Sequence, residues 1–109
     1  MTITYKVLGQ LNPTLTTATN IYTVSSGISA VVSTINVCNQ ANAAATFRVA
    51  VRPLGAALSA VHYISYETSL PAYDSISLSI GITLAATDII TVYASSSTVS
   101  FSVFGSEIS

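Results

Sequence analysis

Few side chains in this sequence can do chemistry, and their spacing matches no catalytic or metal-binding motif. His62 is the only histidine and Cys38 the only cysteine. Neither lies at the spacing that brings metal ligands together, and Cys38 would need a distant histidine to act as a nucleophile. We therefore predict no metal, no cofactor and no catalytic residue. His62 is expected to be a surface or strand-packing residue, and Cys38 a small buried hydrophobic residue.

The four carboxylates are scattered along the chain as Glu67, Asp74, Asp88 and Glu107. Both aspartates lie in expected turns, where Asp bonds to its own backbone. Two carboxylates could still meet in space as they do in glycosidases, but the chain has no tryptophan for the aromatic platform of a sugar-cleaving cleft. The five glycines form no phosphate-binding loop. The sequence therefore predicts a protein that is not an enzyme.

Two arginines are the more informative charges. Arg48 and Arg52 lie four residues apart on one expected strand, so they share a face. If the next strand pairs with theirs, they lie near Tyr63, Tyr66 or Glu67. Arginine and tyrosine are enriched at binding hot spots, so these residues are either interface anchors or ordinary solvated groups in a cross-strand ion pair worth under about 1 kcal/mol.

The remaining tyrosines divide into two kinds. Tyr5, Tyr22 and Tyr93 fall within expected strands, where a tyrosine usually buries its ring, so core packing is predicted for all three. Tyr73 sits in the turn PAYD with no strand phase to bury it. It is therefore a candidate contact residue.

Composition limits the partners. The 109 residues fit one domain, 1–109, and only 6% of them are charged, against roughly 25% in an average soluble domain. A net charge of -1 gives no basic field for nucleic acid, so no nucleic-acid partner is expected. No apolar run approaches the roughly 20 residues of a membrane-spanning helix, and no secretory signal is evident at the N-terminus, so no membrane partner is expected. A single cysteine points to synthesis in a reducing cytoplasm.

Apolar and polar residues alternate with period two along almost the whole chain, which predicts an all-β fold. Turn residues separate the runs, and short strands at this spacing indicate a single-domain antiparallel β-sandwich with Ig-like or jelly-roll topology. Residues 55–60 are expected to form a loop with at most one helical turn. The expected strands, about eight, are Ile3–Leu8, Asn20–Val24, Ala30–Cys38, Thr46–Arg52, Val61–Glu67, Ser75–Ile82, Asp88–Ser95 and Val99–Gly105.

The alternation assigns faces to these strands. In Ser75–Ile82 the four apolar residues, Ile80 among them, are predicted to face the core, and the serines to face outward. In Thr46–Arg52 the core residues are predicted to be Phe47, Val49 and Val51. A serine face is narrow and costs little to desolvate, so we hypothesise that it lies against another subunit. The alternative is that the hydroxyls merely reflect the tolerance of strands for Ser and Thr.

Five motifs, in this order and spacing, resemble small virion structural proteins of tailed bacteriophages, particularly those of cyanobacterial phages. They are YKVLGQ (Tyr5–Gln10), RVAVRP (Arg48–Pro53), LPAYDS (Leu70–Ser75), GITLAATD (Gly81–Asp88) and SFSVFGSEI (Ser100–Ile108). The resemblance covers nearly the whole chain. It implies a non-enzymatic particle component with a β-sandwich fold, present in many copies and assembled in the cytoplasm of the infected host. Its location would be the virion, and its partners the major capsid protein or neck and tail proteins.

Three functions follow as expectations. The first is a head decoration or cement protein, and the second is a neck, tail or baseplate component. The third, from another class, is a host-surface carbohydrate-binding module. Its candidate aromatic contact residues are Tyr63, Tyr66 and Tyr73.

Exposed strand edges and low net charge also predict a homo-oligomer, as a trimer or another ring, or else monomers docked on a lattice. Phe104 is out of phase with Phe101 and Val103, so Phe104 and then Ile108 are candidate contacts with a neighbouring subunit. The alternative for both is packing across the second sheet layer.

Overall fold

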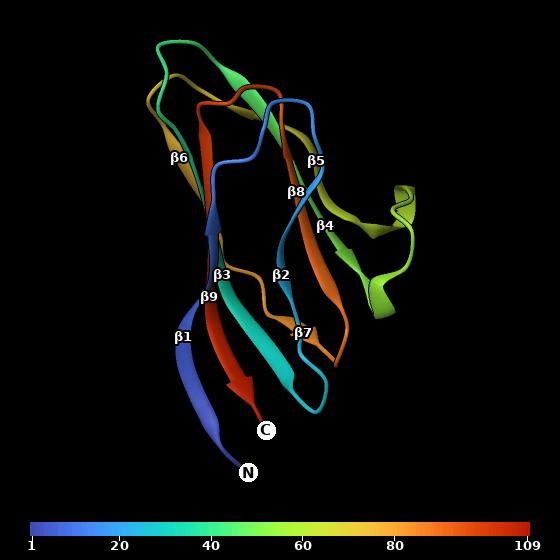
Figure 1. Ribbon diagram of the computed structural model, residues 1–109. Coiled ribbons are helices and arrows are strands. Elements are labelled where there is room, and N and C mark those ends of the chain that lie inside the picture. Colours follow the sequence, from blue (N-terminus) through green and yellow to red (C-terminus); the bar gives the residue numbers. More distant parts are fainter.

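Two antiparallel sheets face each other in the computed structural model, which describes all 109 residues (Figure 1). The first sheet has the order β1 (Ile3–Leu11), β9 (Val99–Ile108), β3 (Ser29–Asn39) and β6 (Ser75–Leu78), with β7 (Ile82–Leu84) also paired to β3. The second has the order β2 (Thr19–Thr23), β8 (Ile89–Ala94), β4 (Ala45–Arg52) and β5 (Tyr63–Leu70). Two short 3-10 turns, η1 (Pro53–Gly55) and η2 (Ala60–His62), connect β4 to β5. The predicted all-β sandwich is confirmed.

The order of the strands identifies the topology as a jelly roll. β6 and β7 pair with successive parts of β3, so together they fill one strand position. Counted in this way, eight positions are divided equally between the two sheets, and consecutive strands lie in different sheets except for β4 and β5, which is the double Greek key order. An Ig-like sandwich would place its first two strands side by side in one sheet, whereas here β1 and β2 belong to different sheets. Of the two predicted topologies, the jelly roll is correct.

The core lies between the sheets and is built from alternate residues of each strand. Phe47 from β4 and Phe101 from β9 meet edge to face across the layers, with ring centroids 6.1 Å apart. Phe47 and Val49 are fully buried as predicted, while Val51 is partly buried and packs against the core. The other large residues with almost no exposed surface are Ile35, Leu70, Leu84, Ile90, Val24, Val32, Val37, Val92 and Val99.

One predicted strand is interrupted. Ser75–Ile82 divides into β6 and β7, because the stretch from Leu78 to Ile82 is one residue longer than the part of β3 that it follows, from Ile35 to Val32. Ile76, Leu78 and Ile82 pack against the core as predicted. Ile80 lies in the interruption, outside both paired segments, and is 43% exposed, so its predicted place in the core is wrong.

The predicted strand Val61–Glu67 is shifted along the chain. Val61 belongs to η2 and is exposed, so β5 begins at Tyr63 and runs on to Leu70. Glu67 has a left-handed backbone (φ 51°) where two residues of β5 lie opposite Arg48 of β4. This β-bulge breaks the period-two pattern, which explains why the predicted strand ends at Glu67 although β5 continues to Leu70.

Several single residues also differ from their predictions. Tyr22 is buried as predicted, but Tyr5 is 83% exposed and Tyr93 is only half-buried. Cys38 is partly exposed, because it points outward from β3 between Ser75 and Ser100. His62 ends η2, where its Nδ1 accepts a hydrogen bond from the backbone N–H of Ser59. No helix in the structure has the length and apolar character needed to cross a membrane.

Candidate interaction surfaces

The candidate residues lie on opposite faces of the sandwich. Arg48, Tyr63 and Tyr66 come together on the outer face of the second sheet. Phe104 and Ile108 lie on the outer face of the first sheet. The structure therefore brings together two separate groups of candidates, and Tyr73 and Arg52 belong to neither.

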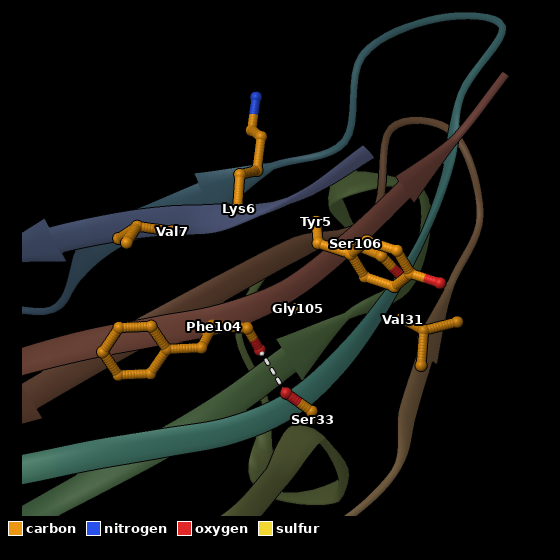
Figure 2. A pocket seen from close by; sticks show the side chains of 8 residues that line it. All are labelled: Tyr5, Lys6, Val7, Val31, Ser33, Phe104, Gly105 and Ser106. Carbon is orange, nitrogen blue, oxygen red and sulfur yellow. Dashed lines mark hydrogen bonds between the residues drawn. The ribbon is translucent and has the colours of Figure 1, made fainter. Parts of the chain in front are cut away.

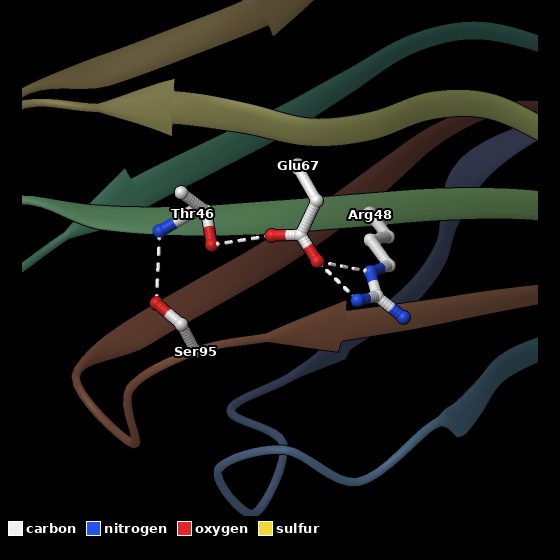
Figure 3. A network of polar contacts seen from close by, with 4 residues as sticks. All are labelled: Thr46, Arg48, Glu67 and Ser95. Carbon is white, nitrogen blue, oxygen red and sulfur yellow. Dashed lines mark hydrogen bonds and ion pairs between the residues drawn. The ribbon is translucent and has the colours of Figure 1, made fainter.

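On the second sheet, Arg48 is held on three sides. Its guanidinium lies 4.4 Å from the ring centre of Tyr66 and 4.1 Å from that of Tyr93, within the range of a cation–π contact. Its Nε and Nη2 both donate to the Glu67 carboxylate, which also accepts a hydrogen bond from the Thr46 hydroxyl (Figure 3). The predicted cross-strand ion pair is present, and Arg48 has its charge largely satisfied within its own chain.

Next to this pair lies an open groove lined by Ser59, Ala60, Tyr63 and Tyr66. The two tyrosine rings pack edge to face with centroids 4.9 Å apart, and Tyr66 remains 59% exposed. Rigid aromatic rings of this kind offer apolar area at little cost in conformational entropy. The groove is therefore a candidate aromatic contact site on this face.

Arg52 is used inside the chain. It donates to the Oδ1 of Asn20 and the Oγ1 of Thr91, and to the backbone carbonyls of Gly55 and Ala56. These bonds fasten β2, β8 and the turn after β4 to one another. An interface role for Arg52 stays a prediction.

Tyr73 stands alone in the turn between β5 and β6. It is 71% exposed and has a left-handed backbone (φ 55°). Its backbone N–H donates to the carbonyl of Ala41, which fixes the turn while leaving the ring in solvent. Its isolation removes it from the aromatic group formed by Tyr63 and Tyr66.

One half of the outer face of the first sheet carries an exposed apolar patch (Figure 2). On β9, Phe101 and Val103 point into the core, so Phe104 and Ile108 point outward, as their phase predicted. The alternative that they pack across the second sheet layer is wrong. The patch consists of Ile3, Tyr5, Val7, Val31, Phe104 and Ile108.

The other half of this face is polar but uncharged. A polar row crosses four strands, with Gln10 donating to Ser102 at 3.1 Å and Asn36 donating to Ser77 at 3.0 Å. Ser75 and Ser77 are exposed, so the predicted serine face exists along β6. Short side chains bonded to one another leave this half flat.

No charged side chain interrupts the face, because its two nearest charges turn to the other side of the sheet. Glu107 accepts a hydrogen bond from the hydroxyl of the buried Tyr22 at 2.6 Å, and its other oxygen pairs with the ammonium of Lys6 at 2.9 Å. Figure 2 shows Lys6 pointing away from Phe104 and Val31. The lysine and the glutamate therefore neutralise each other at the end of the sandwich interior.

Both paired glutamates have lowered pKa values. The hydrogen bond from Tyr22 and then that from Lys6 hold the pKa of Glu107 below its usual value. The hydrogen bonds from Arg48 and then Thr46 do the same to the pKa of Glu67. Burial and the neighbouring Glu107 raise the pKa of Tyr22, so its hydroxyl stays protonated and donates.

These directions predict acid lability. A carboxylate whose pKa is lower in the folded state stabilises the fold above its unfolded pKa of about 4.3, and this contribution is lost as the pH falls through the folded pKa. The urea midpoint is therefore expected to be flat from neutral pH to about 5 and to fall below that. Glu107→Gln should have a lower midpoint at neutral pH and converge with the native protein in acid.

The matched variant is Glu67→Gln, which removes the other lowered carboxylate. It should show the same convergence with a smaller offset, because the Glu67 side chain is 39% exposed and that of Glu107 only 18%. A native midpoint independent of pH, or a constant offset of Glu107→Gln down to strong acid, would contradict the assignment.

Sequence reasoning missed five residues of these surfaces. Tyr93 is predicted for the core, yet it covers one side of Arg48. Ile3, Tyr5, Val7 and Val31 lie in the apolar patch. The alternation of β1 does place Tyr5 and Val7 on one face, but the apolar face of this edge strand looks outward, and only the contacts of Lys6 reveal this inversion.

No three residues of the metal-binding types His, Cys, Asp and Glu gather in one place in this structure. A scan against protein-family models and a search of curated proteins each find no match for the chain.

Proposed function

We propose that this chain is a non-enzymatic structural component of a tailed-phage virion, and that it is a decoration or cement protein that binds the assembled head. Its partner would be the major capsid protein, and it would be assembled in the host cytoplasm. The observation that carries the proposal is the outer face of the first sheet, which has no charged side chain over four strands.

The physical argument concerns desolvation. When a surface that carries lysine or glutamate docks, each charge loses its water and must be paired. The loss of water costs on the order of several kcal/mol for each buried ion. Here the apolar patch supplies area, and the polar row supplies hydrogen-bonding groups that are cheap to bury once paired. A decoration protein fits this argument, because each copy that docks on the shell buries its own uncharged face.

The fold supports the proposal without carrying it. Jelly rolls are used in viral capsid and lectin domains, among others, so the topology alone favours no single role. The motifs that resemble phage virion proteins direct the choice toward the particle. A place in the neck, tail or baseplate would use the same uncharged face against a different neighbour.

A second candidate, a host-surface carbohydrate-binding module, is favoured by the groove beside Tyr63 and Tyr66. Exposed aromatic rings next to an arginine and a glutamate are the groups that sugar rings contact in open sites. Because Arg48 and Glu67 bond each other, few convergent polar groups remain for a ligand. The groove therefore ranks below the uncharged face.

The test measures binding of the purified protein to expanded empty heads of the phage that encodes it, and counts its copies on separated heads and tails. Phe104→Asp introduces a charge into the apolar patch and is expected to weaken head binding at least about tenfold, which corresponds to roughly 1.4 kcal/mol. The matched control is Tyr66→Asp on the opposite face, which should bind heads like the native protein.

The other outcomes separate the alternatives. A few copies found only on tails would favour the neck, tail or baseplate role. Binding to host polysaccharide that Tyr66→Asp abolishes and Phe104→Asp leaves intact would favour the carbohydrate-binding module. Absence from the particle would refute the virion role.

A further inference from the structure

One edge strand of the first sheet, β1, has backbone groups without a partner strand. β1 has β9 on one side and no strand on the other (Figure 1). Thr2 and Ser109 exchange both backbone hydrogen bonds, so in this antiparallel ladder Thr4 and Lys6 also bond to β9. The backbone N–H and C=O groups of Ile3, Tyr5 and Val7 therefore point to the open side.

This edge is the most regular of the sandwich. From Ile3 to Val7 the register with β9 is unbroken, and the shift comes only after Val7. The other edges are blunted, since β6 and β7 are short, β2 has a register shift after Asn20, and β5 is bent by the bulge at Glu67. Short strands and bulges are the usual protection against edge pairing. The first half of β1 has neither.

The side chains of this edge strand are also suited to pairing with another strand. Ile3, Tyr5 and Val7 are all exposed, and they form the border of the apolar patch. The one charge on this stretch, Lys6, is already paired with Glu107 of its own chain. A second copy would therefore meet neither a free charge nor a like charge along this strand.

We propose that β1 pairs antiparallel with β1 of a second copy about a two-fold axis at Tyr5. In this register Tyr5 faces Tyr5 of the second copy, and Ile3 faces its Val7, so every residue with open backbone groups meets another of the same kind. Such a contact is isologous and closes on itself as a dimer.

The partner is a second copy because the strand is complementary to itself in both hydrogen bonding and charge. Lys6 lies opposite Thr4 of the second copy, and the protein's net charge of -1 adds little repulsion. The pairing joins the two apolar patches into one continuous surface across the dimer. It does not depend on the virion role, since it follows from the edge strand alone.

The test is a charge swap at the two-fold axis, read out as solution mass by light scattering. The native protein is expected to have twice the 11.3 kDa mass of the monomer. Tyr5→Lys and Tyr5→Glu place like charges opposite each other, so each alone should dissociate at least tenfold more readily. An equimolar mixture should regain the dimer through Lys–Glu pairing. Tyr73→Lys is the control, since it adds the same charge at another exposed tyrosine that lies outside the apolar patch and outside β1.

Amide exchange gives a second reading that does not rely on these variants. The N–H groups of Ile3, Tyr5 and Val7 have no acceptor within the chain, so they should be protected in the native dimer and exchange fast in Tyr5→Lys. A native monomer at all concentrations, a trimer, or a mixture of the two charged variants that stays monomeric would overturn the proposal. Unprotected amides at these three positions in a dimer would also overturn it.

Discussion

Gly105→Ala is expected to destabilise the protein by about 3 kcal/mol or more, the severe end of overpacking effects. A methyl group at Gly105 would lie 2.1 Å from the carbonyl oxygen of Val31 and 3.0 Å from the Cα of Val32. Both are backbone atoms of β3, so no side chain can move aside. The clash can be relieved only by separating β9 from β3, the two central strands of the first sheet. Urea unfolding at neutral pH measures the effect.

The cause of this close approach is the bulge on β3. Ser33 is an extra residue between Val32, which lies opposite Gly105, and Thr34, which lies opposite Phe104. Its hydroxyl donates to the carbonyl of Phe104, which draws the two backbones together (Figure 2). Bulges bend a strand and raise its twist locally, and here the bend brings β3 against the position without a side chain.

Gly81→Ala is the matched control for this prediction. Gly81 lies in the interruption between β6 and β7 and has no positive φ, and no atom lies within 4 Å of the position that an added methyl group would take. Its replacement should change the free energy of unfolding by no more than about 0.5 kcal/mol. Equal effects of the two substitutions would show that β9 and β3 do not approach as described.

The period-two pattern was sufficient to predict the sandwich and most of its core. Alternation placed Phe47 and Val49 inside and Phe104 outside, because in these central strands one face is always covered by the opposite sheet. Such strands have one apolar side that can only face inward. The pattern and the packing then give the same answer.

The pattern failed where strands lie at an edge or change register. On β1 the apolar side faces outward, because Lys6 on the other side pairs with Glu107 at the end of the sandwich. Ile80 lies where the register shifts, and such shifts depend on the partner strand rather than on the local sequence. Of these regions only β1 contributes to a candidate docking surface, so the apolar patch was predicted in part: Phe104 was found from its phase, whereas Tyr5 and Val7 were missed.

The two arginines illustrate a different limit. Spacing was enough to predict that Arg48 lies near Tyr63 and Tyr66, but it did not predict the role of either arginine. Arg48 is enclosed by Tyr93 from a strand distant in sequence, and Arg52 bonds to Asn20 and Thr91 on two other strands. Only the strand order brings these partners together.

Phe101→Ala is expected to lower the free energy of unfolding by about 3–5 kcal/mol, a large part of the 5–15 kcal/mol typical of a domain. Phe101 is 1% exposed and forms the contact with Phe47 that joins the two sheets. Its removal loses apolar burial and leaves a cavity that rigid strands on both sides fill poorly. Thermal and urea unfolding should both report the loss.

Phe104→Ala, three residues further along the same strand, is the matched comparison. The ring is partly exposed on the outer face, so its loss should cost less than about 1 kcal/mol, as expected for a surface position. The same variant should weaken docking of the apolar patch, whereas Phe101→Ala should not affect docking once the protein is folded. A slip of one residue would exchange inward and outward positions along β9. Equal stability losses for the two alanine variants would therefore refute the register on which the proposed docking face and the proposed β1 pairing both depend.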